Sequence, residues 1–267
     1  MSIEFEKYSC ENQYGERYEY EENSIALYIV LTRKCNTHCK FCEYHTGKSD
    51  IDLDIFDKTL DKILKQCDIT TVHFTGGEPT LELDKLKQIC KIIKQKSSLI
   101  TTSVNTNGTR LKELENIEEL DNIALSRHAV SDIENQEIFG NNIVPSATEI
   151  SDFKDKHKLH LSCNLIKGYV DNYSKLIEYL EFSANLGIND IGLVGLMNIN
   201  SYCNQHLVKL DDFEIKDDVI KNIRGDIGFY FNRYAGGDDQ TKRFTENISL
   251  YLALIAKKPL HPFSEDK

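Results

Sequence analysis

The feature that most restricts the fold is an alternation of two kinds of segment along the chain. Short runs rich in apolar and β-branched residues alternate with longer segments whose apolar residues recur at helical spacing. The runs expected to form strands are residues 24–32, 70–74, 99–105, 123–126, 158–166 and 190–197. This order predicts an α/β fold, a partial (β/α)6 TIM-like barrel with parallel strands and right-handed crossovers.

The segments between these strands predict the helices. Residues 54–67, 83–96, 115–122 and 172–187 are expected to be helical, and the last of them ends at a glycine. Beyond residue 200 the pattern is weaker: a strand is expected at 228–234, a turn at 234–240 and a helix at 244–258. We therefore expect an N-terminal extension (1–24), a core (25–200) and a short C-terminal extension (201–267) that closes the barrel and substrate pocket.

Unusual residues follow the expected strands rather than precede them. Three cysteines follow the first strand, and the second, third, fourth and sixth strands are followed by TGGEPT (75–80), NTNG (105–108), SRH (126–128) and MNIN (197–200). In barrels of this kind the chemistry gathers at the carboxyl ends of the strands. The placement predicts one shared site.

Composition excludes several classes of protein. The 267 residues carry a net charge of −11, which argues against a nucleic-acid polymer as partner. The chain has no apolar run of eighteen residues, and its first residues are acidic and polar, so neither a membrane span nor a signal peptide is expected. We expect a cytoplasmic protein whose eight cysteines are reduced.

The cysteines of CNTHCKFC (35–42) stand at intervals of four and three, as Cys35, Cys39 and Cys42. Structural zinc sites use four protein ligands, and iron–sulfur clusters are usually held by four cysteines. Three thiolates would leave one position open for another ligand.

CxxxCxxC followed by FTGGEP (74–79) resembles the radical S-adenosylmethionine (SAM) superfamily, whose cysteine motif follows the first strand of a partial (β/α)6 barrel. The resemblance implies a [4Fe–4S] cluster on Cys35, Cys39 and Cys42, with SAM on the fourth iron. It also implies reductive cleavage of SAM to a 5′-deoxyadenosyl radical that takes hydrogen from a substrate, and an electron donor such as flavodoxin or ferredoxin.

The resemblance also implies which residues contact SAM. These are Phe41, Gly76, Gly77, Glu78, Asn105, Ser126, Arg127 and Leu196. Glu78 would accept hydrogen bonds from the methionine ammonium, and Arg127 would pair with the carboxylate. The alternatives are a simple turn before Pro79, capping roles for Asn105 and Ser126, and a surface position for Arg127.

Over residues 25–200 the chain resembles the branch that contains the GTP cyclase of molybdenum-cofactor synthesis, viperin and peptide-modifying enzymes. Cys203 is the one cysteine beyond residue 200, so no second cluster is expected. The segment before residue 25 is short, so we expect no separate leader-peptide-binding domain, which weakens the case for a standard peptide-modifying enzyme. These two differences from the branch leave the identity of the substrate open.

Three functions follow from this comparison. The first is hydrogen abstraction from a small metabolite or peptide in a biosynthetic or modification pathway. The second is a viperin-like nucleotide-modifying enzyme, for which Arg127, Arg233, Lys242 and Arg243 are the candidate phosphate ligands. The third is a non-catalytic iron–sulfur or zinc-binding module.

Further side chains are candidates for the substrate pocket. Cys203 could return a hydrogen atom to a substrate radical, or it could be a buried or exposed thiol without that role. Other candidates at or beyond strand ends are His128, Asn198, Asn200, Tyr230 and Asn232.

Overall fold

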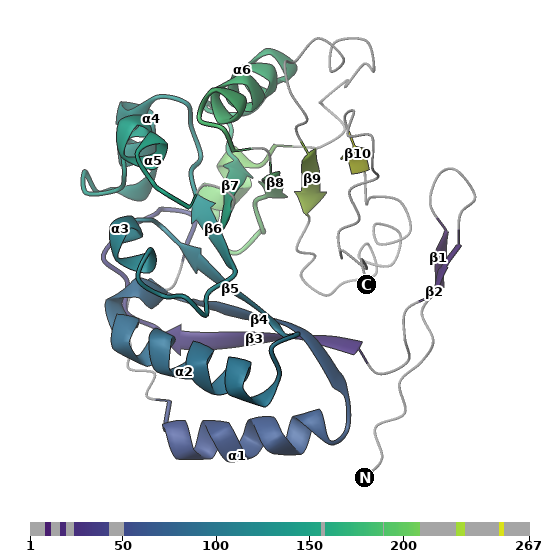
Figure 1. Cartoon of the computed structure of the whole chain (residues 1–267). Helices are drawn as coiled ribbons and strands as arrows, with labels where there is room; N and C mark the ends of the chain where they lie inside the picture. Colours follow the sequence, from purple (N-terminus) through teal and green to yellow (C-terminus); the bar gives the residue numbers. More distant parts are fainter. Residues whose placement is uncertain are drawn as a thin grey trace. The chain divides into compact units, whose positions relative to one another are not determined.

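The computed structural model describes residues 24–42, 51–155, 158–188 and 190–208, together with the backbone of four short strands. These strands are β1 (Ser9–Glu11), β2 (Arg17–Glu19), β9 (Gly228–Asn232) and β10 (Tyr251–Ala253). The chain divides into two compact units, which are described in turn (Figure 1).

The first unit comprises residues 1–35, 44–105 and 116–122. After the antiparallel hairpin β1–β2 it contains β3 (Ser24–Thr32), α1 (Leu53–Leu64), β4 (Asp68–Gly76), the short 3-10 helix η1 (Pro79–Glu82), α2 (Leu83–Lys96) and β5 (Thr101–Thr106). β4 lies between β3 and β5 and is parallel to both, and His73 is opposite Tyr28 on one side and Ser103 on the other.

Local sequence accounts for the two helices of this unit. Asp52 caps α1, because its side chain accepts a hydrogen bond from the Ile55 N–H at 2.9 Å. α2 has a fully buried face of Leu86, Ile89, Cys90 and Ile93. Figure 1 shows α1 and α2 side by side along β3 and β4.

Residues 115–121 form turns, so the helix expected at 115–122 is wrong. The Asp121 carboxylate accepts hydrogen bonds from the Thr102 N–H at 2.7 Å and from Lys94 Nζ at 2.6 Å. The Thr102 hydroxyl also donates to the Glu119 carbonyl at 2.5 Å. These bonds hold the segment against the start of β5, and a contact with a distant strand has overridden local helical spacing.

The second unit comprises residues 36–43, 106–115 and 123–267. Its strand order is β10-β9-β8-β7-β6, with β6 (Asn122–Ser126), β7 (Leu159–Leu165), β8 (Asp190–Gly195) and β9 parallel and β10 antiparallel to β9. Its helices are α3 (Leu111–Leu114), α4 (Asp132–Phe139), α5 (Ala147–Ser151), α6 (Tyr173–Asn185) and α7 (Ser201–His206).

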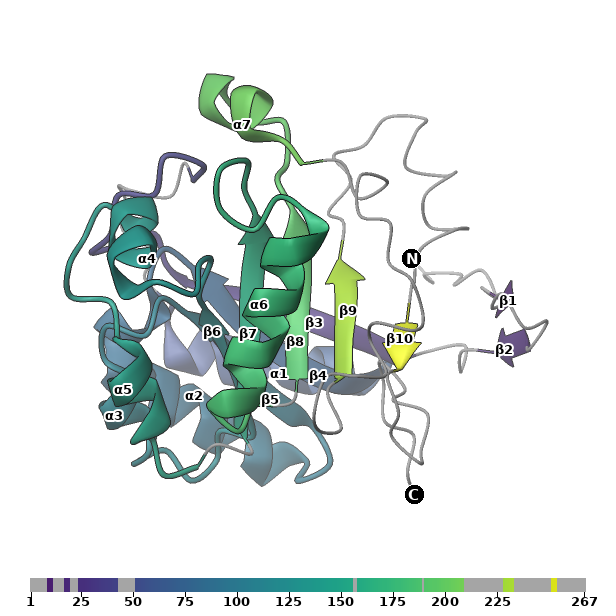
Figure 2. The same cartoon turned by 90° about the horizontal axis from the view of Figure 1, so that it is seen from above.

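α6 lies over β7 and β8 (Figure 2). Its buried residues include Leu176, Tyr179 and Leu180, and the Tyr179 hydroxyl donates to the Arg127 carbonyl at 2.8 Å. The helix ends as expected, because Gly187 adopts a φ of +76° just beyond its C-cap. These side chains of α6 form part of the buried core of the second unit.

All six strands expected between residues 24 and 197 are present, and their parallel pairing within each unit confirms the α/β prediction. The helix expected at 244–258 is wrong at Tyr251–Ala253, which is the strand β10. These three residues pair with β9, and an apolar run of this length forms a strand where such a partner is available. The turn expected at 234–240 lies outside the described residues.

No helix in the part of the chain that the structure describes is both long enough and apolar enough to cross a membrane.

Candidate active site

The turn after β4 packs on the segment that leads to Cys35. The Gly77 N–H donates to the Thr32 carbonyl and the Glu78 N–H to the Lys34 carbonyl, both at 2.8 Å. A Cβ atom added to Gly76 would lie 2.1 Å from the Thr32 oxygen, and one added to Gly77 would lie 2.0 Å from the Lys34 oxygen. The two glycines therefore permit a close approach between two backbones of the same unit.

Glu78 is buried at the C-terminal end of β4, with 1% of its surface exposed. Its Oε1 accepts hydrogen bonds from the Thr80 N–H at 3.0 Å and from the Thr80 hydroxyl at 2.6 Å. With Pro79 as the first residue of η1, Glu78 serves as that helix's N-cap. Asn105, at the end of β5 in the same unit, is half-buried.

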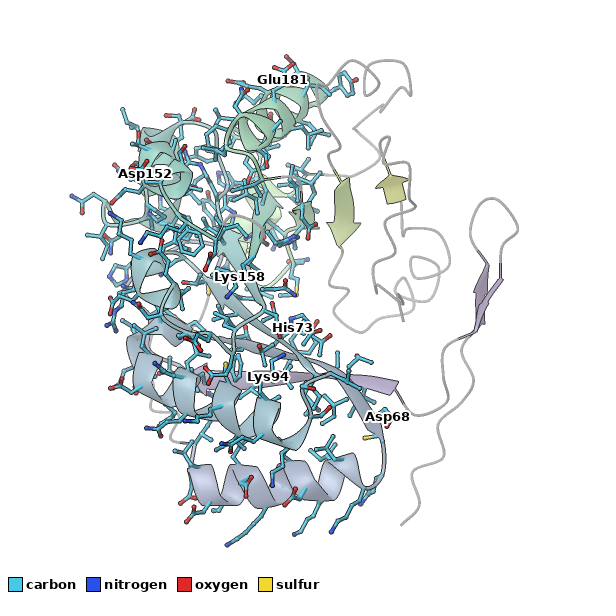
Figure 3. The ribbon with its side chains drawn as sticks, in the orientation of Figure 1. Asp68, His73, Lys94, Asp152, Lys158 and Glu181 are labelled. Atoms are coloured by element: carbon cyan, nitrogen blue, oxygen red, sulfur yellow. The ribbon has the colours of Figure 1, made fainter. Side chains whose placement is uncertain are left out.

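Four uncharged residues, Tyr28, Val30, His73 and Thr75, lie on the face of β3 and β4 that points away from the buried side chains. Tyr28, which is 58% exposed, stacks on His73 with ring centroids 4.8 Å apart, and Val30 lies beside Thr75 on the same face. Figure 3 labels His73 on β4. Burial lowers the pKa of His73, which keeps the imidazole neutral at pH 7. Such a face offers aromatic and hydroxyl groups rather than cations to a ligand.

In the second unit, residues 36–42 form what we call the cysteine loop. Asn36 donates to the Thr109 hydroxyl and accepts from Asn107 Nδ2, both at 2.8 Å. Asn141 Nδ2 donates to the Asn36 carbonyl. These bonds fix the first residue of the loop.

The end of α4 packs closely on the middle of the cysteine loop. The His38 N–H donates to the Phe139 carbonyl at 2.8 Å. Gly140, the left-handed C-cap of α4, would bring an added Cβ within 3.2 Å of the His38 carbonyl oxygen. The loop is therefore held by residues far from it in sequence.

Residues in and just before α7 contact the end of the same loop. Asn200 Nδ2 donates to the Lys40 carbonyl at 3.1 Å, and Lys40 Nζ lies 5.9 Å from the centre of the Tyr202 ring. Cys203, which is 1% exposed, has its Sγ 3.6 Å from the Phe41 carbonyl. The thiol proposed as a hydrogen donor therefore lies against the residue that precedes Cys42.

The donor chemistry of the motif cysteines fits an iron–sulfur cluster. None of the cysteines in the described ranges forms a disulfide, and Cys35 and Cys42 are partly exposed whereas Cys39 is buried. Cys35 belongs to the first unit, and Cys39 and Cys42 belong to the second, where they pack with Phe139 and Val144. Within the residues described, no three Cys, His, Asp or Glu side chains are already gathered around a metal position.

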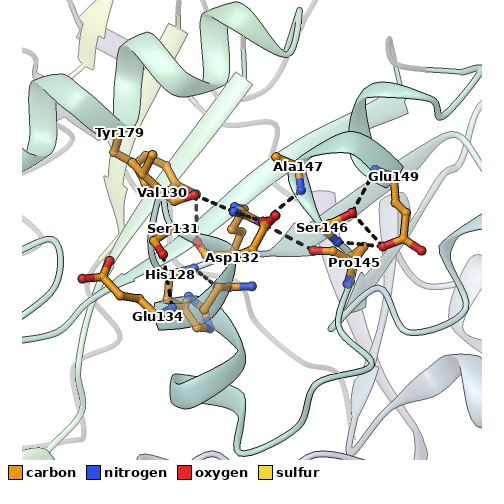
Figure 4. Close-up of polar contacts among 12 residues, drawn as sticks. His128, Val130, Ser131, Asp132, Glu134, Pro145, Ser146, Ala147, Glu149 and Tyr179 are labelled. Carbon is orange, nitrogen blue, oxygen red and sulfur yellow. Dashed lines mark hydrogen bonds and ion pairs between the residues drawn. The ribbon is translucent and has the colours of Figure 1, made fainter.

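Arg127 is enclosed by its own unit, and Figure 4 labels its hydrogen-bond partners Val130, Asp132 and Pro145. Its Nη2 donates to the Val130 carbonyl at 2.6 Å and to Asp132 at 2.7 Å, and its Nη1 donates to the Pro145 carbonyl at 3.2 Å. The guanidinium also lies over the Phe182 ring, and 1% of the residue is exposed. The alternative of a surface arginine is therefore wrong.

His128, one residue further on, is also buried. Its backbone N–H donates to Asn135 Oδ1 at 2.8 Å, and its ring Nδ1 accepts from the backbone N–H of Asn164 at 3.0 Å. Burial, and secondly the charge of Arg127, lowers the His128 pKa to about 3.

The remaining predicted site residues have diverse positions. Ser126 ends β6 opposite Ser162, and Leu196 packs near Phe41 against Ala129, Ile138 and Ile166. Asn198 is exposed. The side chains of Tyr230, Asn232, Arg233, Lys242 and Arg243 lie outside the described residues.

The role of Asn36, Asn107 and Asn141 in holding the cysteine loop was not expected from the sequence. Their one signal in the sequence is a position beside a motif cysteine or a glycine.

Comparison with known proteins gives three findings. Residues 29–148 match the family model described as "Radical SAM superfamily". The chain is 32% identical over 215 residues to a "Probable GTP 3′,8-cyclase" of Saccharolobus islandicus, which covers 74% of this chain and 67% of that protein. The corresponding protein of Saccharolobus solfataricus is 33% identical with the same coverage.

Two solved structures share the fold. SuiB of Streptococcus suis bound to S-adenosylmethionine superposes with a TM-score of 0.59 at 18% identity, over 80% of this chain and 51% of SuiB. A radical SAM methyltransferase from Sphaerobacter thermophilus gives 0.58 at 14% identity, over 86% and 73%. The chain thus spans about half the length of SuiB.

The parallel strands and their alternating helices define an α/β fold of the partial-barrel class, which confirms the predicted fold class. The chain belongs to the radical SAM superfamily. It is an enzyme of that class, and the predicted cofactors, SAM and a [4Fe–4S] cluster, are those of the family.

Proposed function

We propose that this chain is a catalytically active radical SAM enzyme that acts on a small metabolite or a short peptide in a biosynthetic or modification pathway. The observation that supports the proposal most strongly is the way the chain fixes the cysteine motif. The turn after β4, with Gly76 and Gly77, holds the segment before Cys35. In the cysteine loop, groups from elsewhere in the same unit form hydrogen bonds with Asn36, His38, Lys40 and Phe41.

In this proposal Cys35, Cys39 and Cys42 hold the [4Fe–4S] cluster. When bound, the cluster and SAM supply a 5′-deoxyadenosyl radical, which takes hydrogen from the substrate. The chain's own residues bind the cofactors, orient them and exclude water. A flavodoxin or ferredoxin would supply the electron, and the cytoplasm would be the compartment.

Several residues would orient SAM. Glu78 offers a buried carboxylate that can accept from the methionine ammonium. Gly76 and Gly77 act at this site by holding the turn that carries Glu78. Asn105 and Ser126, each at a strand end, would bond the ribose or methionine part.

Phe41 and Leu196, which both pack against the cluster of Ala129, Ile138 and Ile166, would supply apolar contact for the adenine. Arg127 already has Val130, Asp132 and Pro145 as partners. We therefore propose that Arg127 positions the end of β6 and the start of α4, instead of pairing with the SAM carboxylate.

The uncharged face formed by Tyr28, Val30, His73 and Thr75 supports a substrate without phosphates. A polyphosphate would need lysine or arginine at such a surface. Nucleotide chemistry remains the second candidate, because relatives about one-third identical are named GTP 3′,8-cyclases.

The test is anaerobic reconstitution of the whole chain with iron and sulfide, followed by SAM and dithionite. We expect 5′-deoxyadenosine from the wild type and from Cys67→Ala, a buried cysteine outside the motif. We expect none from the Cys35→Ala, Cys39→Ala, Cys42→Ala triple variant. Equal formation by the triple variant would refute the assignment of the cluster ligands.

The same assay distinguishes the candidate substrates. A metabolite or peptide that accelerates 5′-deoxyadenosine formation, and passes deuterium to it, would support the first candidate. Acceleration by GTP, and by none of the metabolites or peptides tested, would support the second candidate, nucleotide chemistry. A cluster-loaded protein that binds SAM and cleaves none with any substrate would favour a non-catalytic binding module.

A further inference from the structure

His128 packs against the side chains that surround two motif cysteines. Its ring stacks on Phe139 with centroids 5.0 Å apart and meets Phe41 edge-on at 5.3 Å. Phe139 packs with Cys39, and Phe41 and Cys42 pack against the same cluster. Only 2% of His128 is exposed, so the ring is an interior part of the second unit's cysteine site.

The hydrogen bond at Nδ1 determines where the ring carries its proton. A peptide N–H can only donate, so the Asn164 N–H at 3.0 Å requires an unprotonated Nδ1. The proton of the neutral imidazole is then on Nε2. An imidazolium would set two N–H groups against each other at this contact, and burial beside Arg127 also disfavours the cation.

Among the residues that the structure describes, Nε2 has no hydrogen-bond partner. A buried donor left unpaired costs about 1–3 kcal/mol, so interior donors generally bond to protein, water or ligand. The geometry therefore leaves one uncharged N–H donor without a hydrogen-bond partner in the described residues, on a ring that contacts Phe41 of the cysteine loop.

We propose that His128 is a positioning residue whose Nε2–H donates to an anionic acceptor of the cofactors held at the cysteine loop. The acceptor is either a sulfur of the cluster or the carboxylate of SAM. Hydrogen bonds to cluster sulfurs shift the reduction potential, and bonds to a carboxylate strengthen binding. The inference rests on the proposed function, because both acceptors arrive only with the cofactors.

Two substitutions separate this role from simple packing. In His128→Asn the amide oxygen can take the place of Nδ1 and accept from Asn164, but no donor reaches the Nε2 position. In His128→Gln the longer side chain can place its amide N–H where Nε2–H was. If His128 has only a structural role, the Asn variant should stay closer to the wild type in the measured properties. If Nε2–H is the proposed donor, the Gln variant should stay closer to the wild type. His160→Gln, which alters a histidine paired with Asp190 on the same sheet, is the matched control.

The measurements are the SAM dissociation constant and the midpoint potential of the cluster, each on anaerobically reconstituted full-length protein. If the SAM carboxylate is the acceptor, His128→Asn weakens SAM binding about tenfold, since a hydrogen bond to a charged group contributes about 1.5 kcal/mol or more. If a cluster sulfur is the acceptor, the potential moves to more negative values without SAM. The Gln and control variants stay near the wild type.

Other outcomes would overturn the inference. A His128→Asn protein equal to the wild type in both measurements, or equal losses in the Asn and Gln variants, would leave only a packing role. Histidine 15N spectra of the cluster-free protein provide an independent check, because Nε2 should carry the proton throughout pH 5–8. A wild type that takes up neither cluster nor SAM would instead refute the proposed function, and the inference with it.

Discussion

Gly77 depends on its lack of a side chain because an added Cβ would lie 2.0 Å from a backbone oxygen that cannot rotate away. Gly76 and Gly77 were expected to contact SAM. In the structure both glycines permit a close approach to the chain's own residues 32–34. Their contact with SAM stays a prediction.

We therefore expect Gly77→Ala to destabilise the protein by about 1–3 kcal/mol, because the overpacked turn must shift. The shift should also lower cluster uptake, since it moves the segment before Cys35. Urea unfolding and iron content per chain measure the two effects. Gly195→Ala is the control, because an added Cβ there meets nothing within 4 Å. Equal stability of both variants would contradict the packing account.

At the scale of elements, α7 was not predicted, yet it brings Cys203 against the cysteine loop. Asn200 caps this helix by accepting from the Cys203 N–H at 2.9 Å, and the same side chain donates to the Lys40 carbonyl. One asparagine thus begins the helix and ties it to the loop. The buried thiol is held against the Phe41 carbonyl, and its role as a hydrogen donor stays a prediction.

If Cys203 is that donor, Cys203→Ala retains SAM cleavage and loses deuterium incorporation from solvent into the product. The reason is that the thiol hydrogen of Cys203 exchanges with solvent deuterium before it is transferred to the substrate radical. Mass spectrometry of the product in D2O measures it, with Cys90→Ala, a buried cysteine of α2, as the control. Retained incorporation would remove Cys203 from the mechanism and leave it a packing role against Phe41.

For the whole molecule, the buried neutral His128 links stability to pH. Its folded pKa of about 3 lies below the ordinary 6.5, so below pH 6.5 the unfolded chain binds the proton that the folded chain excludes. The stabilisation is present above pH 6.5 and is lost as the pH falls toward 3, at up to about 1.4 kcal/mol per pH unit.

We expect the free energy of unfolding of the cluster-free protein to fall more between pH 7 and pH 5 in the wild type than in His128→Asn. The difference should be about 1–2 kcal/mol, because the Asn side chain has no proton to gain. Urea titrations at the two pH values measure it. Parallel pH dependences in the two proteins would show that His128 is charged, or free to charge, in the folded state.

The sequence alone determined the order of the strands along the chain, the position of the motif residues after the strands, and the cofactor class. Buried strands and amphipathic helices are written in local apolar periodicity, and a cluster motif is a matter of residue type and spacing over eight positions. The same information was insufficient at 115–122 and 251–253, where Asp121 and β9 supply partners that no local window contains.

Only the tertiary structure decided what each polar residue does. Arg127, expected at a ligand or the surface, is enclosed with Asp132 and Phe182, and three asparagines distant in sequence meet at the cysteine loop. The proton of His128 is fixed by a peptide N–H from β7. The physical reason is that hydrogen bonds and burial depend on neighbours in space, whereas strand and helix periodicity depends on neighbours along the chain.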